Sequence, residues 1–421
     1  MSDRIQRIWH PDPDAYGPRR LRKPCSYEAY LPDLLDGVTF DLPSDLAADI
    51  ADAERELAIF DTRIHEAHDL EQLARFLLRA EAVASSKIEG LEVSSRRLAR
   101  HAAGHPGQDA TADAVLGNVA AMMLAVNEVA GADIVTRDHL LRIHAALMEQ
   151  TPMPQLAGQI RTTQNWIGGN DFNPCQAAFV PPPPDRVLEL LDDLCAFINR
   201  DDLPGVLQAA LTHAQFETIH PFIDGNGRTG RALIHVVFRR RKLATDFVPP
   251  VSLALATDTD AYVAGLTAYR YHGPAAGPAA REGLQRWVET FLSATRRATR
   301  DAEALRTSLL ELEARWRAKL NPRRNSAADK LLPLLIANPV VSVDDVARLT
   351  GVSSSAAYVA IEQVVAAGIV TPVSGSARNR LFEARNVFRV LTDYERASAT
   401  LSGDTRTERP RRSVPYRSEG N

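Results

Sequence analysis

The chain has 421 residues, of which 45% are hydrophobic and 24% are charged, a size and composition that suit two or three globular domains. Its formal net charge of −4 excludes a global basic field that would draw it to nucleic acid or to an anionic membrane. The N-terminus lacks the apolar run of a secretory signal, and no uncharged apolar stretch reaches the ~18 residues of a transmembrane helix. We therefore expect no membrane contact.

The three cysteines are widely spaced and form no Cys-x-x-Cys pair: Cys25, Cys175 and Cys195. This usage is typical of reduced thiols, and it predicts a cytoplasmic protein.

The N-terminal third is predicted to be mostly helical. Residues 1–30 are rich in Pro, Arg and Tyr and are expected to be poorly ordered or draped over another domain. Between residues 43 and 103 apolar side chains recur every three to four positions, which predicts helices. Two further helices are predicted within residues 113–149.

One short stretch predicts strands. Residues 158–171 combine Thr, Trp and Ile with Gly-Gly-Asn-Asp, which indicates a β-hairpin and is the only strand signal in the first 300 residues. Helical periodicity then resumes, and it predicts helices from about residue 185 and over residues 206–219, 229–242, 258–272 and 279–319.

The C-terminal part has a different character. Three helices are predicted at residues 326–336, 342–349 and 354–367, and two strands at residues 369–372 and 380–382. Three helices followed by a two-stranded wing are typical of a winged helix. The third helix contains no Lys or Arg, which is unfavourable for contact with DNA phosphates. The last residues, rich in Arg, Ser, Thr and Pro, predict a disordered tail.

The most informative segment runs from His220 to Arg231, with the sequence HPFIDGNGRTGR. Apolar residues on both sides recur at helical spacing, so the segment is predicted to be helix, sharp loop, helix. A Gly-Asn-Gly turn that opens a helix is suited to binding anions, because its N–H groups and the helix dipole face the ligand.

The side chains of this segment add to that chemistry. Arg228 and Arg231 provide planar donors for phosphate oxygens, and Asp224 provides a hard oxygen ligand of the kind that Mg²⁺ takes beside phosphates. His220 titrates near neutral pH. The combination favours phosphoryl or nucleotidyl transfer.

The segment resembles the signature of the Fic family, His-x-Phe-x-(Asp/Glu)-Gly-Asn-Gly-Arg-x-x-Arg, at every specified position. The resemblance implies a mainly α fold, with an all-helical Fic core, a small β-hairpin flap and a C-terminal winged-helix domain. The implied domains are an N-terminal helical region at 1–110, a catalytic domain at 111–320, a winged helix at 321–395 and a disordered tail at 396–421.

The resemblance also implies transfer of AMP from ATP to a Tyr, Ser or Thr hydroxyl of a target protein, including the chain itself. His220 would be the general base, and Asp224 would hold Mg²⁺. The implied nucleotide contacts are Glu89, His220, Gly225, Asn226 (to the α-phosphate), Gly227, Arg228, Thr229, Gly230 and Arg231, with Thr257 and Tyr262 near the adenine.

A second motif precedes the signature. Ser85, Glu89 and Gly90 match the family's inhibitory element, (Ser/Thr)-x-x-x-Glu-(Gly/Asn). By resemblance, Glu89 pairs with Arg231 in the resting state and misplaces the triphosphate. Without the signature, the same residues would indicate only a helix end with a solvated glutamate.

The predicted hairpin resembles the family's flap, which presents an extended edge to a target polypeptide. Its implied target-binding residues are Ile160, Arg161, Thr162, Gln164, Asn165, Trp166 and Ile167. An ordinary surface hairpin is the alternative.

Three other functions remain open at this stage. Glu89 could position water for removal of AMP, the donor could be another nucleotide, or the chain could be a transcription regulator whose winged helix binds DNA. The resemblance makes a homodimer plausible, and the sequence does not identify the target protein.

Overall fold

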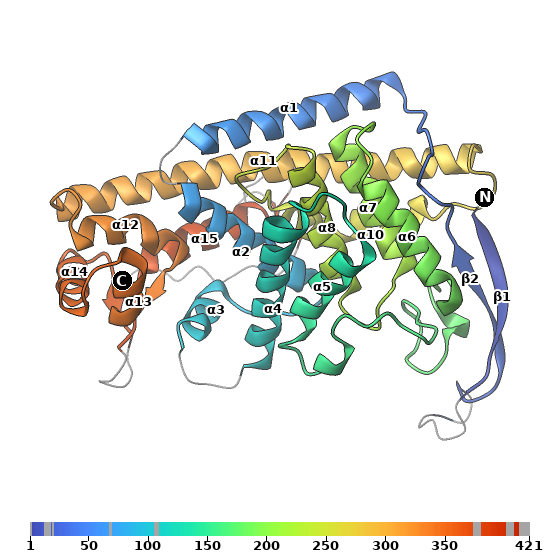
Figure 1. Cartoon of the computed structure of the whole chain (residues 1–421), viewed down its shortest axis with the longest axis horizontal. Coiled ribbons are helices and arrows are strands. Elements are labelled where there is room, and N and C mark those ends of the chain that lie inside the picture. The colour runs from blue at the N-terminus through green and yellow to red at the C-terminus, as the bar shows by residue number, and fades with distance from the viewer. Residues whose placement is uncertain are drawn as a thin grey trace. The chain divides into compact units, whose positions relative to one another are not determined.

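The computed structural model describes residues 2–11, 18, 21–66, 70–104, 109–373, 380–400 and 408–411 of the chain (Figure 1). Helices predominate, so the predicted mainly α fold is confirmed. The chain divides into two compact units, each assembled from separate stretches. Unit 1 comprises Met1–Glu54, Ala120–Leu243 and Asp260–Ser293, and unit 2 comprises Arg55–Val119, Ala244–Thr259 and Ala294–Asn421.

The described N-terminal residues form a β-ribbon, so of the two expectations for residues 1–30 the poorly ordered state is wrong for these strands. Strands β1 (Asp3–Trp9) and β2 (Cys25–Leu31) pair antiparallel over their whole length. The ribbon is attached to the rest of unit 1, because the Tyr30 N–H donates to the Val180 carbonyl at 2.9 Å and the Ser2 hydroxyl donates to the Tyr271 carbonyl at 3.0 Å. These attachments join residues far apart in sequence, which local composition does not reveal.

The centre of unit 1 is formed by two helices that are consecutive in the chain and pack against each other, α7 (Gly205–Ile219) and α8 (Asn226–Arg240). Every residue of α7 is buried, and α8 is buried over most of its length. Both helices were predicted, although α8 begins three residues earlier than expected. The other elements of unit 1 are α5 (Arg137–Met148), η3 (Pro154–Leu156), η4 (Pro174–Gln176), η5 (Pro184–Arg186), α6 (Val187–Ile198) and α10 (Thr259–Tyr269).

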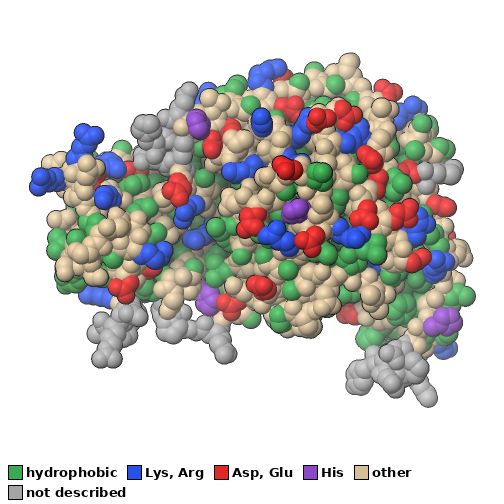
Figure 2. All heavy atoms as spheres, in the orientation of Figure 1, with side chains coloured by type: hydrophobic (Ala, Val, Ile, Leu, Met, Phe, Trp, Pro, Cys, Tyr) green, Lys and Arg blue, Asp and Glu red, His purple; other side chains and the backbone are tan. Residues whose placement is uncertain are grey.

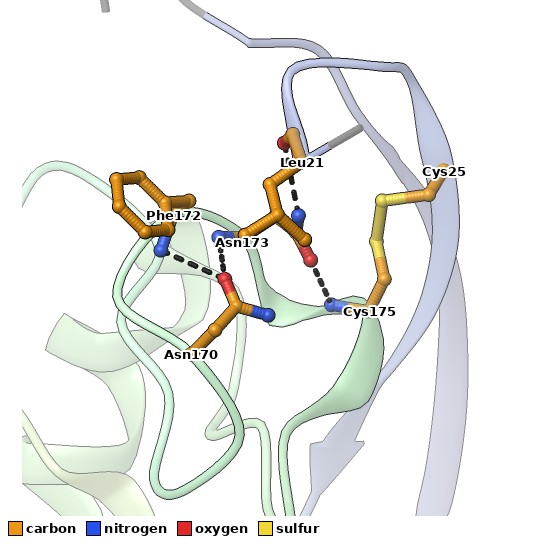
Figure 3. Close-up of a disulfide and its surroundings, with 6 residues drawn as sticks. All are labelled: Leu21, Cys25, Asn170, Phe172, Asn173 and Cys175. Carbon is orange, nitrogen blue, oxygen red and sulfur yellow. Dashed lines mark hydrogen bonds between the residues drawn. A yellow bond between two sulfur atoms is a disulfide. The ribbon is translucent and has the colours of Figure 1, made fainter. Parts of the chain in front are cut away.

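A disulfide links Cys25 in β2 to Cys175 in η4 (Figure 3). The expectation of three reduced thiols is therefore wrong for this pair. The two cysteines are 150 residues apart in sequence, but β2 packs against η4 and brings their Cα atoms to 6.2 Å. Nearby, the Asn173 side chain donates to the Leu21 carbonyl at 3.0 Å and accepts from the Cys175 N–H at 3.1 Å. Only Cys195 is a free thiol, and burial raises its pKa to about 12.

Unit 2 contains α2 (Leu70–Ile88), α3 (Ser95–Ala102) and α9 (Val251–Thr257), and it shares with unit 1 the helices α1 (Ser44–Glu66), α4 (Ala110–Leu124) and α11 (Pro278–Leu320). Helix α4 continues as a π-helical turn, η2 (Ala125–Val129). In the described residues Ala110–Val129 is the one stretch long and apolar enough to span a membrane, with a mean hydropathy of 1.3 over its best window. Because 56% of that window is buried, the stretch fits a core helix equally well.

The C-terminal module follows the predicted order. Helices α12 (Ala327–Ala337), α13 (Val343–Thr350) and α14 (Ser354–Ala366) precede β4 (Thr371–Pro372) and β5 (Phe382–Glu383). The sequence did not reveal the two-residue strand β3 (Val340–Val341), which pairs with β5 to complete a β3-β5-β4 sheet, or helix α15 (Arg385–Ala397). Most of the predicted wing loop, residues 374–379, lies outside the described residues.

The predicted start of the tail at residue 396 is wrong. Helix α15 continues to Ala397, and Ser398, Ala399 and Thr400 are buried. The Ser398 carbonyl accepts from the Thr257 hydroxyl, and the Thr400 carbonyl accepts from Arg297. Most of the predicted tail, residues 401–407 and 412–421, lies outside the described residues. On the face shown in Figure 2 acidic and basic side chains are interspersed, as the small net charge suggests.

Candidate nucleotide-binding site

The signature loop begins at His220, which closes α7 in a left-handed conformation with φ of 48° and ψ of 60°. Its N–H still bonds to the Phe216 carbonyl at 2.9 Å, so the turn follows the last helical hydrogen bond directly. The His220 side chain is 18% exposed, whereas the next two residues, Pro221 and Phe222, are buried. The imidazole is thus the polar group that the start of the loop can present to a ligand.

Gly225 ends the loop and precedes α8, also in a left-handed conformation, with φ of 81°. A Cβ atom here would lie 2.9 Å from Leu147 Cδ2 and 3.3 Å from the His144 ring, so only glycine fits. The Thr229 N–H bonds to the Gly225 carbonyl at 3.0 Å. Helix geometry therefore leaves the N–H groups of residues 226–228 without an intrahelical acceptor, at the positive end of the dipole.

The Asn226 side chain has a structural role that the sequence did not indicate. Its Oδ1 accepts from the Phe222 N–H and its Nδ2 donates to the Phe222 carbonyl, both at 2.9 Å. These two bonds close the loop. They use Oδ1 and one of the two Nδ2 hydrogens, and the contact of Asn226 with the α-phosphate stays a prediction.

Gly230 was expected to lie in the phosphate nest, but it lies one turn inside α8, where its N–H belongs to the helix. A Cβ atom on Gly230 would lie 3.0 Å from Phe216 Cδ1 and 3.1 Å from Glu217 Oε1, so the glycine allows α8 to pack closely against α7. Thr229 is likewise buried within the helix. The backbone N–H groups that can bind an anion therefore end at residue 228, before Thr229 and Gly230.

The charged residues of the signature lie on the first turns of α8. Arg228 is almost fully buried, and its Nη2 lies 3.4 Å from each carboxylate oxygen of Asp224. The Asp224 side chain is 44% exposed and remains accessible to a cation. Arg231 is buried. Among the described residues no group of three or more His, Cys, Asp and Glu side chains could form a metal site by itself.

His144 supports the loop from α5, a role that sequence reasoning missed. Its ring stacks on Phe222 with centroids 3.6 Å apart. Nδ1 accepts from the Gly158 N–H at 3.1 Å, so Nε2 carries the proton and donates to the Asp224 carbonyl at 3.0 Å. Burial lowers the pKa of His144 to about 4, which keeps the ring neutral.

Glu217 lies one turn before His220 and is a second residue that the sequence did not single out. Its Oε2 lies 3.8 Å from His220 Nδ1, and its carbonyl accepts from Arg270 Nη2 at 3.2 Å. Arg270 is held over the Phe179 ring, with 3.8 Å from the guanidinium carbon to the centroid. Burial lowers the pKa of Arg270 to about 10, which leaves it charged at neutral pH.

The two residues predicted to contact adenine are both buried and engaged elsewhere. The Thr257 hydroxyl donates to the carbonyls of Leu253 and Ser398 within unit 2. The Tyr262 hydroxyl lies 2.8 Å from His213 Nε2 within unit 1. In this structure the Thr257 hydroxyl serves the packing of the C-terminal residues, and the adenine contacts of Thr257 and Tyr262 stay predictions.

The predicted flap is an irregular loop and not a hairpin. Within residues 158–171 the only residue with a β bridge is Ile167. Its partner, Phe179, lies beyond the segment that was expected to form the hairpin. Arg161 is 3% exposed and bonds to backbone carbonyls, so its side chain is not available to a target. Trp166 packs edge-on against Trp9 of β1 and donates to the Asn170 carbonyl at 2.6 Å. Ile160, Thr162, Gln164, Asn165 and Ile167 are partly or fully exposed.

The inhibitory element lies at the end of α2 in unit 2. Ser85 is buried inside the helix, α2 ends at Ile88, and Gly90 adopts φ of 78°. The N–H groups of Glu89 and Gly90 bond to the carbonyls of Ser86 and Lys87. The helix therefore ends at this motif, and Glu89 is exposed just beyond it. Its pairing with Arg231 stays a prediction.

Comparison with known proteins agrees with the signature. The nematode protein adenylyltransferase fic-1 from Caenorhabditis elegans is 32% identical over 133 residues, which are 31% of this chain and 23% of that protein. Protein adenylyltransferase Fic from Culex quinquefasciatus is 32% identical over 111 residues, 26% of this chain and 20% of that protein. The similarity thus spans about a quarter of the length of these relatives or less.

A solved structure shares the fold more broadly. A Fic family protein from Desulfovibrio desulfuricans G20 aligns over 82% of this chain and 97% of its own, with a TM-score of 0.51 and 20% identity. Residues 134–238 match the Fic/DOC family, and residues 47–127 match the N-terminal region of that family. These two regions, which include both the signature and the inhibitory element, are similar to the Fic/DOC family.

Proposed function

We propose that the protein is an autoinhibited protein adenylyltransferase, which transfers AMP from ATP to a hydroxyl group of a target protein. The observation that carries this proposal is the loop between α7 and α8. It places an imidazole, a left-handed glycine and a helix N-terminus within seven residues, beside two buried arginines. The names of the curated relatives support the same reaction.

Each group has a chemical task in this reaction. His220 takes the proton from the target hydroxyl, since a neutral hydroxyl is a weak nucleophile. The N–H groups of residues 226–228 bind phosphate oxygens and stabilise the charge that develops on them. Arg228 and Arg231 bind the β- and γ-phosphates, which leave as diphosphate. His144 and Asn226 hold the loop so that these groups keep their places.

Asp224 would hold Mg²⁺ together with the phosphates of ATP, and the ion would neutralise phosphate charge. The donor set fits this use, because the Asp224 side chain is partly exposed and carries a hard oxygen ligand. A single protein carboxylate is the usual arrangement where substrate phosphates complete the coordination.

Glu89 is proposed as the inhibitory residue. A carboxylate at the C-terminal end of a helix faces the negative end of the dipole, so it does not stabilise α2. Occupation of Arg231 by this carboxylate would remove a phosphate ligand and place negative charge where the triphosphate must lie.

The test is mass spectrometry of the chain after incubation with ATP and Mg²⁺, in three forms: wild type, Glu89→Gly and His220→Ala. We expect an added AMP on the Glu89→Gly protein, less on the wild type and none on His220→Ala. No AMP on the Glu89→Gly protein would count against transfer from ATP. AMP on the wild type alone would count against inhibition by Glu89.

The alternatives are separated by related assays. Release of AMP from a modified protein, lost in Glu89→Gly, would favour de-AMPylation, and labelled UTP would reveal another donor. DNA binding by the C-terminal module is poorly supported, because the exposed face of α14 carries Tyr358, Val359 and Glu362 and no basic residue. A mobility shift at low salt would test it.

A further inference from the structure

The backbone of His220 is strained. A left-handed conformation costs a residue with a side chain about 1–2 kcal/mol, because Cβ approaches the following carbonyl oxygen. Such a conformation persists only where neighbouring groups hold it in place. Those groups determine where the imidazole points, so they bear directly on the proposed reaction.

Two residues of the flap loop hold this turn. Arg161 Nε donates to the His220 carbonyl at 2.9 Å, and Asn165 Nδ2 donates to the same oxygen at 3.2 Å. The Arg161 N–H donates to the Pro221 carbonyl and Asn165 Nδ2 also donates to the Phe222 carbonyl, both at 2.9 Å. Three consecutive carbonyls of the turn thus accept hydrogen bonds from two side chains and one backbone group of the loop.

Arg161 is itself fixed in the interior. Its guanidinium also donates to the Pro182 carbonyl at 2.6 Å and to the Thr163 carbonyl at 3.3 Å. Burial lowers the pKa of Arg161 to about 10, so the side chain remains charged at neutral pH. A charged donor makes stronger hydrogen bonds to carbonyls than a neutral one. The turn is therefore anchored to a rigid part of unit 1.

We propose that Arg161 and Asn165 are positioning residues that hold His220 in its left-handed conformation and so aim the imidazole for proton transfer. This inference rests on the proposed function for its kinetic test, but the position of the ring can be measured without activity. The same loop segment was expected to bind the target through these two side chains. Their contacts instead direct them inward, towards the turn that bears the base.

The kinetic test uses Asn165→Ala and Asn165→Asp in the Glu89→Gly background. Asn165→Ala removes the donor, and Asn165→Asp keeps the size but places a carboxylate oxygen against two carbonyls. We expect kcat to fall at least tenfold in both variants, with the larger loss for Asn165→Asp, while KM for ATP stays within twofold. A misplaced base lowers the rate of the chemical step without weakening nucleotide binding.

Asn199→Ala is the matched control. Asn199 Nδ2 also donates to two backbone carbonyls of unit 1, those of Val135 and Cys195, each at 2.8 Å. Its removal costs these two hydrogen bonds and the two that Oδ1 accepts from the Val135 N–H and Arg240 Nη2, all outside the signature loop. We therefore expect a change at least as disruptive to packing, with kcat within twofold of the background. A loss of kcat in Asn199→Ala equal to that in Asn165→Ala would overturn the proposal, since general destabilisation would then explain both.

The second readout is the NMR signal of the His220 ring, compared with that of His139 on α5. We expect Asn165→Ala to move or broaden the His220 signal and to leave the His139 signal in place. An unmoved His220 signal overturns the positioning role, whatever the activity. Absence of AMP transfer in the parent protein, together with a moved His220 signal, would refute the proposed function and still support the positioning role.

Discussion

Acidification should weaken the signature loop through His144. This ring is buried, donates a hydrogen bond from Nε2 and accepts one at Nδ1, and the contact at Nδ1 requires the neutral form. Protonation would set an N–H on Nδ1 against the Gly158 N–H. Desolvation is the main cause that lowers the pKa to about 4, with the Arg228 charge acting in the same direction.

The direction of this pH dependence follows from the number of protons that the folded and unfolded chains bind. The unfolded chain has the ordinary histidine pKa of about 6.5, so between pH 6.5 and 4 it binds more protons than the folded protein. Stability is therefore complete above pH 6.5 and falls as the pH drops through this window. Since each pKa unit corresponds to about 1.4 kcal/mol, the full loss is about 3 kcal/mol.

Urea denaturation of wild type and His144→Phe at pH 6.5 and 4 would measure this loss. Phenylalanine keeps the stacking on Phe222 and cannot titrate, so the stability of the variant should fall by about 3 kcal/mol less over this range. His213, whose pKa burial lowers to about 3, contributes equally to both proteins and cancels in the comparison. Equal pH dependence in the two proteins, or an NMR titration of His144 near 6.5, would refute the reasoning.

Three further predictions test the structure at other positions. Gly225→Ala should weaken ATP binding at least tenfold by calorimetry, because its Cβ would clash with Leu147, whereas Gly351→Ala, which has a positive φ but open space, should leave ATP binding unchanged. Cys25→Ser should lower the free energy of unfolding by about 2–5 kcal/mol, and a reductant should destabilise the wild type but not this variant in denaturant melts. Glu383→Gln should cost about 1–3 kcal/mol of stability, because the buried carboxylate pairs with Arg96 and Arg100, whereas Glu311→Gln, from an exposed pair, should cost under about 1 kcal/mol by the same melts.

The sequence predicted those parts of the fold that depend on local pattern. Helical periodicity predicted α2, α7 and α8. The Gly-Asn-Gly turn predicted the start of α8 to within a few residues. Capping is equally local, since Ser342 and Asp345 form a capping box at the start of α13. Each of these features is set by residues within about one helical turn of one another.

Features that depend on distant residues were missed. The pairing of β1 with β2 was hidden by a composition typical of disorder, and the Cys25–Cys175 disulfide depends on a contact across 150 residues. The same limit applied to the site. Thr257 has suitable spacing from the signature, but only the structure places Ser398 against its hydroxyl. Asn226 matches the signature by type, yet its amide closes the loop on Phe222.

The two compact units do not follow the predicted domain borders at residues 110 and 320, since unit 2 joins helices from both sides of each border. Helix α12 packs on α2, where Arg79 donates to the Ala337 carbonyl at 3.2 Å. Arg100 of α3 donates to the buried Glu383 of β5 at 2.6 Å.

Removal of residues 321–421 to isolate the Fic region would therefore uncover α2 and unpair Arg100. A truncated chain would be destabilised in the helix that carries Ser85 and leads to Glu89, so altered AMP transfer by such a chain would reflect damage to the inhibitory element itself.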